Sequence, residues 1–92
     1  SPMAQRFALV SLEEADAYCR HPVLGPRLIE CTQLVNAIPG RSAHKIFGTP
    51  DDLKFRSSMT LFANAQTADG CFEAALQKFF NGEQDPLTLA RI

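Results

Sequence analysis

The stretch TPDDLKFRSSMTLFANA, residues 49–65, opens with residues that favour the start of a helix. Thr49 suits the N-cap position, and Pro50 suits the first helical position because its missing N–H would be unpaired there anyway. Asp51 and Asp52 place negative charge at the positive end of the helix dipole. The sequence therefore predicts a helix that begins at about residue 50.

Apolar side chains of this predicted helix occupy more than one face. Phe55, Met59 and Phe62 recur at three- and four-residue steps, whereas Leu53 and Leu61 fall on other sides. A helix that is apolar on several sides is usually buried on several sides. We therefore expect residues 50–65 to form the central helix of the domain.

Capping residues and stop signals divide the rest of the chain into further short segments. The motif Ser11-x-x-Glu14 is a capping box, His21-Pro22 ends that helix, and Pro39-Gly40 ends the next. Expected helices cover about residues 12–20, 26–38, 43–47 and 70–81, with short turns at residues 1–6 and after Asp85-Pro86. No stretch alternates for long with period two, which strands require. The prediction is an all-α fold of about five short helices, an orthogonal-type bundle forming a single domain over residues 1–92.

Helical spacing also predicts which side chains form the core. The expected inward residues are Leu12, Ala15, Tyr18 and Cys19; Leu28, Cys31, Val35 and Ile38; and Phe72, Ala75, Leu76, Phe79 and Phe80, with Phe7 as a first anchor and Phe7–Val10 as an apolar connection. Cys19 and Cys31 are interpreted as small buried hydrophobes. Cys71 falls in a first helical turn, where the dipole can lower a thiol pKa, so a reactive role is the alternative there.

Composition narrows the class of protein. The chain has 92 residues and a formal net charge of −1, without the basic excess that nucleic-acid binding requires. No apolar run approaches the roughly 20 residues of a spanning helix. Three cysteines, without a CxxC pair, fit a reducing compartment. We expect a cytoplasmic protein that binds neither nucleic acid nor membrane, with no metal site and no cofactor.

Several motifs resemble those of a known family. They are the run SAHKIFGTPDDLKFRSSMTLFA at residues 42–63, EADAYCRHPVLGPRLIECTQL before it and DPLTL after it. The chain resembles the bacterial family called domain of unknown function 1810, and the resemblance covers nearly the whole chain. It implies a mainly helical fold and no particular activity. A calpastatin-like label attached to some members has no support here, because calpain inhibition uses long disordered repeats.

One departure from that family concerns the N-terminus. Members usually carry a segment rich in His, Trp, Phe and Pro-Gln before the position of Ser1, and this sequence lacks it. If that segment helps to form the site, we expect either a natural short form or a fragment with part of its surface uncovered.

Candidate ligand-binding residues gather around the start of the central helix. Lys54, Ser57 and Ser58 project from one side of it, because positions three and four apart are neighbours. A lysine beside serine hydroxyls suits an anionic ligand, or a Ser–Lys nucleophile pair if the lysine is neutral. The structural alternative is that the serines bond carbonyls of the preceding turn while Lys54 reaches solvent.

Two further residues complete this candidate set. Arg56 is a second cation, with an ion pair to Asp52 four positions earlier as its structural alternative. His44 lies in the preceding short helix and is either a base or ligand contact, or a polar surface residue. Arg41 and Lys45 add to the local positive charge.

No complete catalytic set emerges from these residues. We therefore predict a non-catalytic helical module that binds a protein or small ligand, with a protein partner or homo-oligomer using an apolar patch. The alternative is an enzyme acting on a small anionic metabolite, which requires His44, Lys54 and Ser58 to converge on one pocket.

Overall fold

The computed structural model describes residues 11–92, and the predicted turn at residues 1–6, the anchor Phe7 and the connection Phe7–Val10 lie outside them. Within the described range the chain forms six helices and no strand, which confirms the all-α prediction. They are α2 (Leu12–Arg20), α3 (Leu24–Asn36), α4 (Ala43–Phe47), α5 (Asp51–Ala63), α6 (Gly70–Phe80) and α7 (Pro86–Arg91). No helix of this part of the chain is long and apolar enough to cross a membrane.

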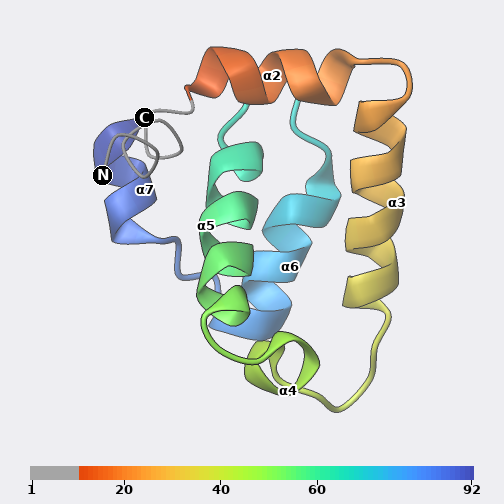
Figure 1. Ribbon diagram of the computed structural model, residues 1–92, viewed down its shortest axis with the longest axis vertical. Coiled ribbons are helices and arrows are strands. Elements are labelled where there is room, and N and C mark those ends of the chain that lie inside the picture. Colours follow the sequence, from red (N-terminus) through yellow and green to blue (C-terminus); the bar gives the residue numbers. More distant parts are fainter. Residues whose placement is uncertain (1–10) are drawn as a thin grey trace.

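The helices form a bundle with one element laid across the others. Helices α5 and α6 lie side by side, α3 packs against the outer side of α6, and α2 crosses near their ends (Figure 1). Helix α5 contacts α2, α4, α6 and α7, as expected of a central helix. Helix α7 flanks α5 on the side away from α3 (Figure 1).

Four helices, α2, α4, α6 and α7, begin at a polar N-cap side chain. Each of these side chains accepts the N–H of a residue two or three positions ahead: Ser11 from Glu14, Ser42 from Lys45, Asp69 from Cys71 and Asp85 from Thr88. These bonds satisfy N–H groups that have no partner inside the helix. The end of α6 uses a left-handed residue, Asn81 at φ 55°, followed by Gly82 at φ 78°.

The predicted N-cap of the central helix is wrong. Helix α5 begins at Asp51, and no side chain among the described residues caps it. The carbonyl of Gly48 accepts the N–H of Asp52 at 2.9 Å, so that N–H needs no hydroxyl. Thr49 instead places its hydroxyl 3.0 Å from Nδ1 of His44.

His21 serves two helices at once. Its backbone N–H closes α2 on the carbonyls of Ala17 and Tyr18, as expected from the Pro that follows it. Its ring Nδ1 accepts the N–H groups of Val23 and Leu24, each at 3.1 Å. Because the ring caps the next helix, α3 begins at Leu24, two residues before the predicted Pro26.

Most of the fully buried core comes from α6. Phe72 and Ala75 are fully buried, and Leu76, Cys71 and, from α5, Met59 join them in one cluster. Phe79 and Phe80 pack against this cluster and are half-buried. The predicted apolar stripe of this helix is confirmed.

Aromatic rings connect the core to its edges. The Phe62 ring lies 5.4 Å from that of Phe72 and 5.8 Å from that of Tyr18. The Phe55 ring lies 4.8 Å from that of Phe47 and 5.9 Å from that of Phe79. Phe55 and Phe62 are half-buried, whereas Met59 and Thr60 of the same helix are buried.

The predicted inward stripe of α3 is confirmed at Leu28, Val35 and Ile38, which are half-buried, but is wrong at Cys31. Cys31 is exposed, whereas Thr32 is buried and donates its hydroxyl to the carbonyl of Leu28 at 2.8 Å. Gly25 is buried against α2, and this contact determines how the helix is rotated. Because the rotation depends on a contact with another helix, spacing alone did not reveal it.

A buried carboxylate, Asp16, was missed in the sequence. It is 8% exposed and accepts hydrogen bonds from the N–H of Thr67 at 3.0 Å and its hydroxyl at 2.5 Å. Arg20 pairs with it at 3.2 Å. The Thr67 hydroxyl, helped by the Thr67 N–H and Arg20, outweighs the effect of burial and lowers the pKa of Asp16. This carboxylate fastens the turn after α5 to α2.

The corner between α2 and α3 depends on Gly25. A Cβ at this position would lie 2.0 Å from the carbonyl oxygen of Cys19, which is backbone and cannot rotate away. Glycine is therefore required here by close approach.

We expect Gly25→Ala to destabilise the fold by about 1–3 kcal/mol, the range for overpacking, because α3 must move away from α2. Gly70→Ala is the matched control, since a Cβ at Gly70 meets no atom within 4 Å. Urea unfolding of both variants measures the difference. Equal stabilities would contradict the close packing described for this corner.

Candidate functional site

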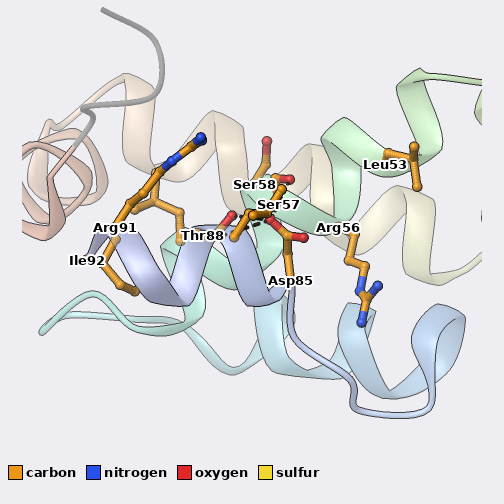
Figure 2. A pocket seen from close by; sticks show the side chains of 10 residues that line it. Leu53, Arg56, Ser57, Ser58, Asp85, Thr88, Arg91 and Ile92 are labelled. Carbon is orange, nitrogen blue, oxygen red and sulfur yellow. Dashed lines mark hydrogen bonds between the residues drawn. The ribbon is translucent and has the colours of Figure 1, made fainter. Parts of the chain in front are cut away.

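A groove of about 440 Å³ runs between α5 and α7. Its lining comes from two segments: Leu53, Arg56, Ser57, Ser58 and Leu61 from α5, and Asp85, Leu87, Thr88, Arg91 and Ile92 from α7 and its ends (Figure 2). The groove combines leucine side chains with hydroxyl groups and two guanidinium groups. This mixture is typical of small-molecule sites, which are mostly apolar with a few placed polar groups.

Helical spacing explains why these side chains share the groove. On α5, Leu53, Ser57 and Leu61 are four positions apart and line one face. On α7, Leu87 and Arg91 are likewise four apart. The groove is therefore formed by one face of α5 and one face of α7, which Ser57 and Asp85 connect by a hydrogen bond.

The carboxylate of Asp85 holds these two helices together. It accepts hydrogen bonds from the Thr88 N–H at 3.0 Å, the Thr88 hydroxyl at 2.6 Å and the Ser57 hydroxyl at 3.2 Å. The Asp85 N–H donates to the Thr60 hydroxyl at 2.9 Å. One residue thus caps α7 and fastens it to α5, as the hydrogen bonds in Figure 2 show.

These bonds also determine the charge of Asp85. Burial alone would raise its pKa, but hydrogen bonds from Thr88 and Ser57, with the nearby Arg56, outweigh burial and hold the pKa below its ordinary value. Asp85 is therefore ionised at neutral pH, and three donors already compensate its charge.

Arg56 acts as a clamp on the segment between α6 and α7. Its Nε donates to the carbonyl of Glu83 and its Nη2 to that of Gln84, both at 3.0 Å. Nη2 also lies 3.6 Å from the Glu83 carboxylate, and the guanidinium is 5.8 Å from the centroid of the Phe80 ring. The predicted ion pair with Asp52 is absent from the described residues because Arg56 reaches across to this segment instead.

The two serines of the candidate set have different surroundings. Ser57 donates to Asp85, whereas Ser58 hydrogen bonds to no residue of the described range and lines the groove. Neither returns its hydroxyl to the preceding turn; Thr60 does so, donating to the Arg56 carbonyl at 2.8 Å. Ser58 therefore offers a hydroxyl to a ligand.

His44 and Lys54 lie outside the groove lining. The Nζ of Lys54 is 3.9 Å from the Asp51 carboxylate, and its side chain is 75% exposed. The Nδ1 of His44 is 3.5 Å from the Asp52 carboxylate at the corner between α4 and α5. The structure therefore brings Arg56, Ser57 and Ser58 together, but not His44 or Lys54.

Sequence reasoning missed Asp85, Leu87, Thr88 and Arg91 as site residues. The helix start at Asp85-Pro86 was recognised, and the spacing of Leu87 and Arg91 was visible. Nothing local indicated that this short helix docks on α5.

Neither the cysteines nor the possible metal ligands of the described residues form a second candidate site. Burial, followed by the Asp69 carboxylate, raises the pKa of Cys71 to about 12, so the suggested reactive role has no thiolate to support it at neutral pH. Burial likewise raises the pKa of Cys19. Within residues 11–92 no three His, Cys, Asp or Glu side chains are grouped to hold a metal ion.

Comparison with known proteins gave a family and a structural relative. The family model described as "Protein of unknown function (DUF1810)" matches residues 1–92. The crystal structure of the conserved hypothetical protein Rv1873 from Mycobacterium tuberculosis is 57% identical in sequence and superposes with a TM-score of 0.88. The alignment covers 98% of this chain and 64% of that chain, so this chain spans less than two thirds of that protein. No curated protein matches the chain.

We expect Asp85→Ala to free α7 from α5, at a cost of about 0.5–2 kcal/mol for the lost cap. Asp85→Asn is the matched variant, because asparagine also caps helices but carries no charge. Hydrogen exchange of the α7 amides should be fast in the alanine variant and slower in the asparagine variant. Unchanged protection of α7 in Asp85→Ala would contradict the role given to this carboxylate.

The same carboxylate predicts how acid acts on the groove. Because the folded-state pKa of Asp85 lies below its unfolded value near 3.8, the stabilisation is complete above that pH and is lost as the pH falls through the folded value. Hydrogen exchange of α7 in wild type should therefore rise at acid pH, beyond its intrinsic pH dependence. Asp85→Asn should lack this acid-dependent rise.

Arg56→Lys tests whether Arg56 is a clamp. Lysine keeps the charge but cannot hold two carbonyls with one planar fork, so we expect a loss of about 2 kcal/mol. Lys54→Gln is the control and should change stability by less than about 0.5 kcal/mol, because its ion pair is exposed. Thermal unfolding measures both. A tolerated Arg56→Lys substitution would contradict the clamp.

Proposed function

The chain belongs to the family described as "Protein of unknown function (DUF1810)", and from this premise we propose that it is a non-catalytic module that binds a small ligand in the groove between α5 and α7. The observation that carries this proposal is the composition of the groove. Leucine side chains, the uncommitted hydroxyl of Ser58 and the guanidinium of Arg91 face one hollow of about 440 Å³.

A binding role is favoured over catalysis by the partners of the groove residues. Activation of the Ser58 hydroxyl as a nucleophile requires a base beside it. The two candidate bases, His44 and Lys54, contact Asp52 and Asp51 instead. Asp85 accepts from Thr88 and Ser57, so its carboxylate serves α7. These contacts support recognition rather than bond making.

The proposal also covers the cellular location of the protein and the part of the groove that the ligand contacts. The three cysteines are free thiols, which supports a reducing, cytoplasmic location. Leu53 and Leu87, 58% and 64% exposed at the groove, provide the apolar surface that we expect the ligand to cover. A protein partner or a second copy covering them is the competing arrangement.

A substitution that fills the groove tests the proposal. Ser58→Leu adds bulk to the lining without removing a hydrogen bond of the described residues, and Lys54→Leu places the same leucine side chain on α5 outside the lining. Small molecules that raise the melting temperature of the wild type should bind Ser58→Leu at least about tenfold more weakly, a loss of about 1.4 kcal/mol. They should bind Lys54→Leu unchanged.

Two outcomes would overturn this assignment. Equal binding by wild type and Ser58→Leu would place the ligand elsewhere. Loss of binding in Lys54→Leu, together with turnover of the bound compound, would favour the enzyme that uses His44, Lys54 and Ser58. Sedimentation equilibrium of the wild type separates the ligand from a second copy, since self-association depends on protein concentration.

A further inference from the structure

We propose that the ligand of the α5–α7 groove is a small amphipathic anion, a carboxylate with an elongated apolar body. This inference rests on the proposed function and adds the chemical class of the ligand. The apolar body would lie along Leu53, Leu61 and Leu87, and the carboxylate would meet Arg91.

The charges of the groove determine the sign of the ligand. Three ionised side chains line it: Arg56, Asp85 and Arg91. Asp85 is compensated by three hydrogen-bond donors, and Arg56 by two carbonyls and the carboxylate of Glu83. Arg91 forms an ion pair with no acid of the described residues. The three lining side chains sum to a formal charge of +1, and Arg91 is the cation whose guanidinium has no acidic partner among the described residues, which favours an anionic ligand.

The position of Arg91 explains why the anionic group goes to one end. Figure 2 shows Arg91 and Arg56 at opposite ends of the groove, with Ser57, Ser58 and Thr88 between them. The fork of Arg56 is occupied by backbone carbonyls, whereas the fork of Arg91 is exposed. A planar guanidinium matches a carboxylate in bidentate geometry. Arg91 is thus the cation available to the ligand.

Apolar side chains determine the rest of the ligand. Leu53 and Leu87 stand 58% and 64% exposed, and Leu61 and Ile92 are half-buried beside them. Covering these side chains with hydrocarbon removes apolar surface from water, which favours binding. A fully polar anion such as phosphate would leave them exposed. The volume of about 440 Å³ lies in the range of roughly 300–1,000 Å³ that holds small molecules.

Matched ten-carbon probes separate charge from apolar contact. Decanoate and decylamine below their micellar concentrations, and decan-1-ol below its solubility limit, are titrated into the full chain and followed by amide chemical shifts. We expect decanoate to bind tightest, decan-1-ol more weakly and decylamine weakest, with shift changes confined to α5 and α7.

Removing the cation tests its role directly. Arg91→Gln should weaken decanoate binding about fivefold, as expected for an exposed ion pair, and leave decan-1-ol binding unchanged. Arg41→Gln is the matched control, since it removes an exposed arginine outside the groove lining, and it should bind both probes as the wild type does.

The opposite results overturn the inference in distinguishable ways. If all three probes bind equally well on α5 and α7, the ligand is not an anion. The same follows if Arg91→Gln loses as much affinity for decan-1-ol as for decanoate. Both results leave the proposed groove site in place. Shift changes outside α5 and α7 reject both. Shifts of α5 and α7 that depend on protein concentration without any probe show that a second copy covers the groove, which also rejects both.

Discussion

Packing of α6 against α5 is the constraint from which the rest of the structure follows. Phe72, Ala75 and Leu76 are almost fully buried, and Met59 meets them from α5. Burial of this apolar surface is the main favourable contribution to the fold. Because α5 turns this face to α6, its opposite face with Leu53, Ser57 and Leu61 is left for α7. The groove lies along that second face.

The attachment of α7 differs in kind from the core. None of its residues is buried, and polar groups hold it: the Asp85 carboxylate on Ser57 and Thr88, and the Arg56 guanidinium on the carbonyls before it. Elements with few buried apolar contacts open more easily than the core. The candidate site is therefore formed by the least buried helix of the described chain. Ligand contacts with Leu87 would add the apolar burial that this helix lacks.

Differences between the expected and observed contacts share one physical cause. Spacing along α3 placed Leu28, Val35 and Ile38 on the inward side correctly, but Cys31 is exposed and Thr32 is buried beside them. Spacing along α5 likewise suggested an ion pair between Asp52 and Arg56, yet Arg56 reaches the 83–84 backbone. When a helix has polar and apolar residues on several sides, packing against its neighbours determines which side faces inward. A long side chain such as that of Arg56 can reach partners that are distant in sequence.

The sequence by itself determined the helices, because capping residues, prolines and glycines act within a few positions of each other. It also placed Arg56, Ser57 and Ser58 on one region of α5, since helical spacing is local. Only the tertiary structure decided that α7 docks beside them, that His44 and Lys54 turn elsewhere, and that Asp85 and Arg91 join the groove. The hydrogen bonds that dock α7 on α5 join residues 25 to 28 positions apart, and no local pattern encodes which distant polar groups will meet.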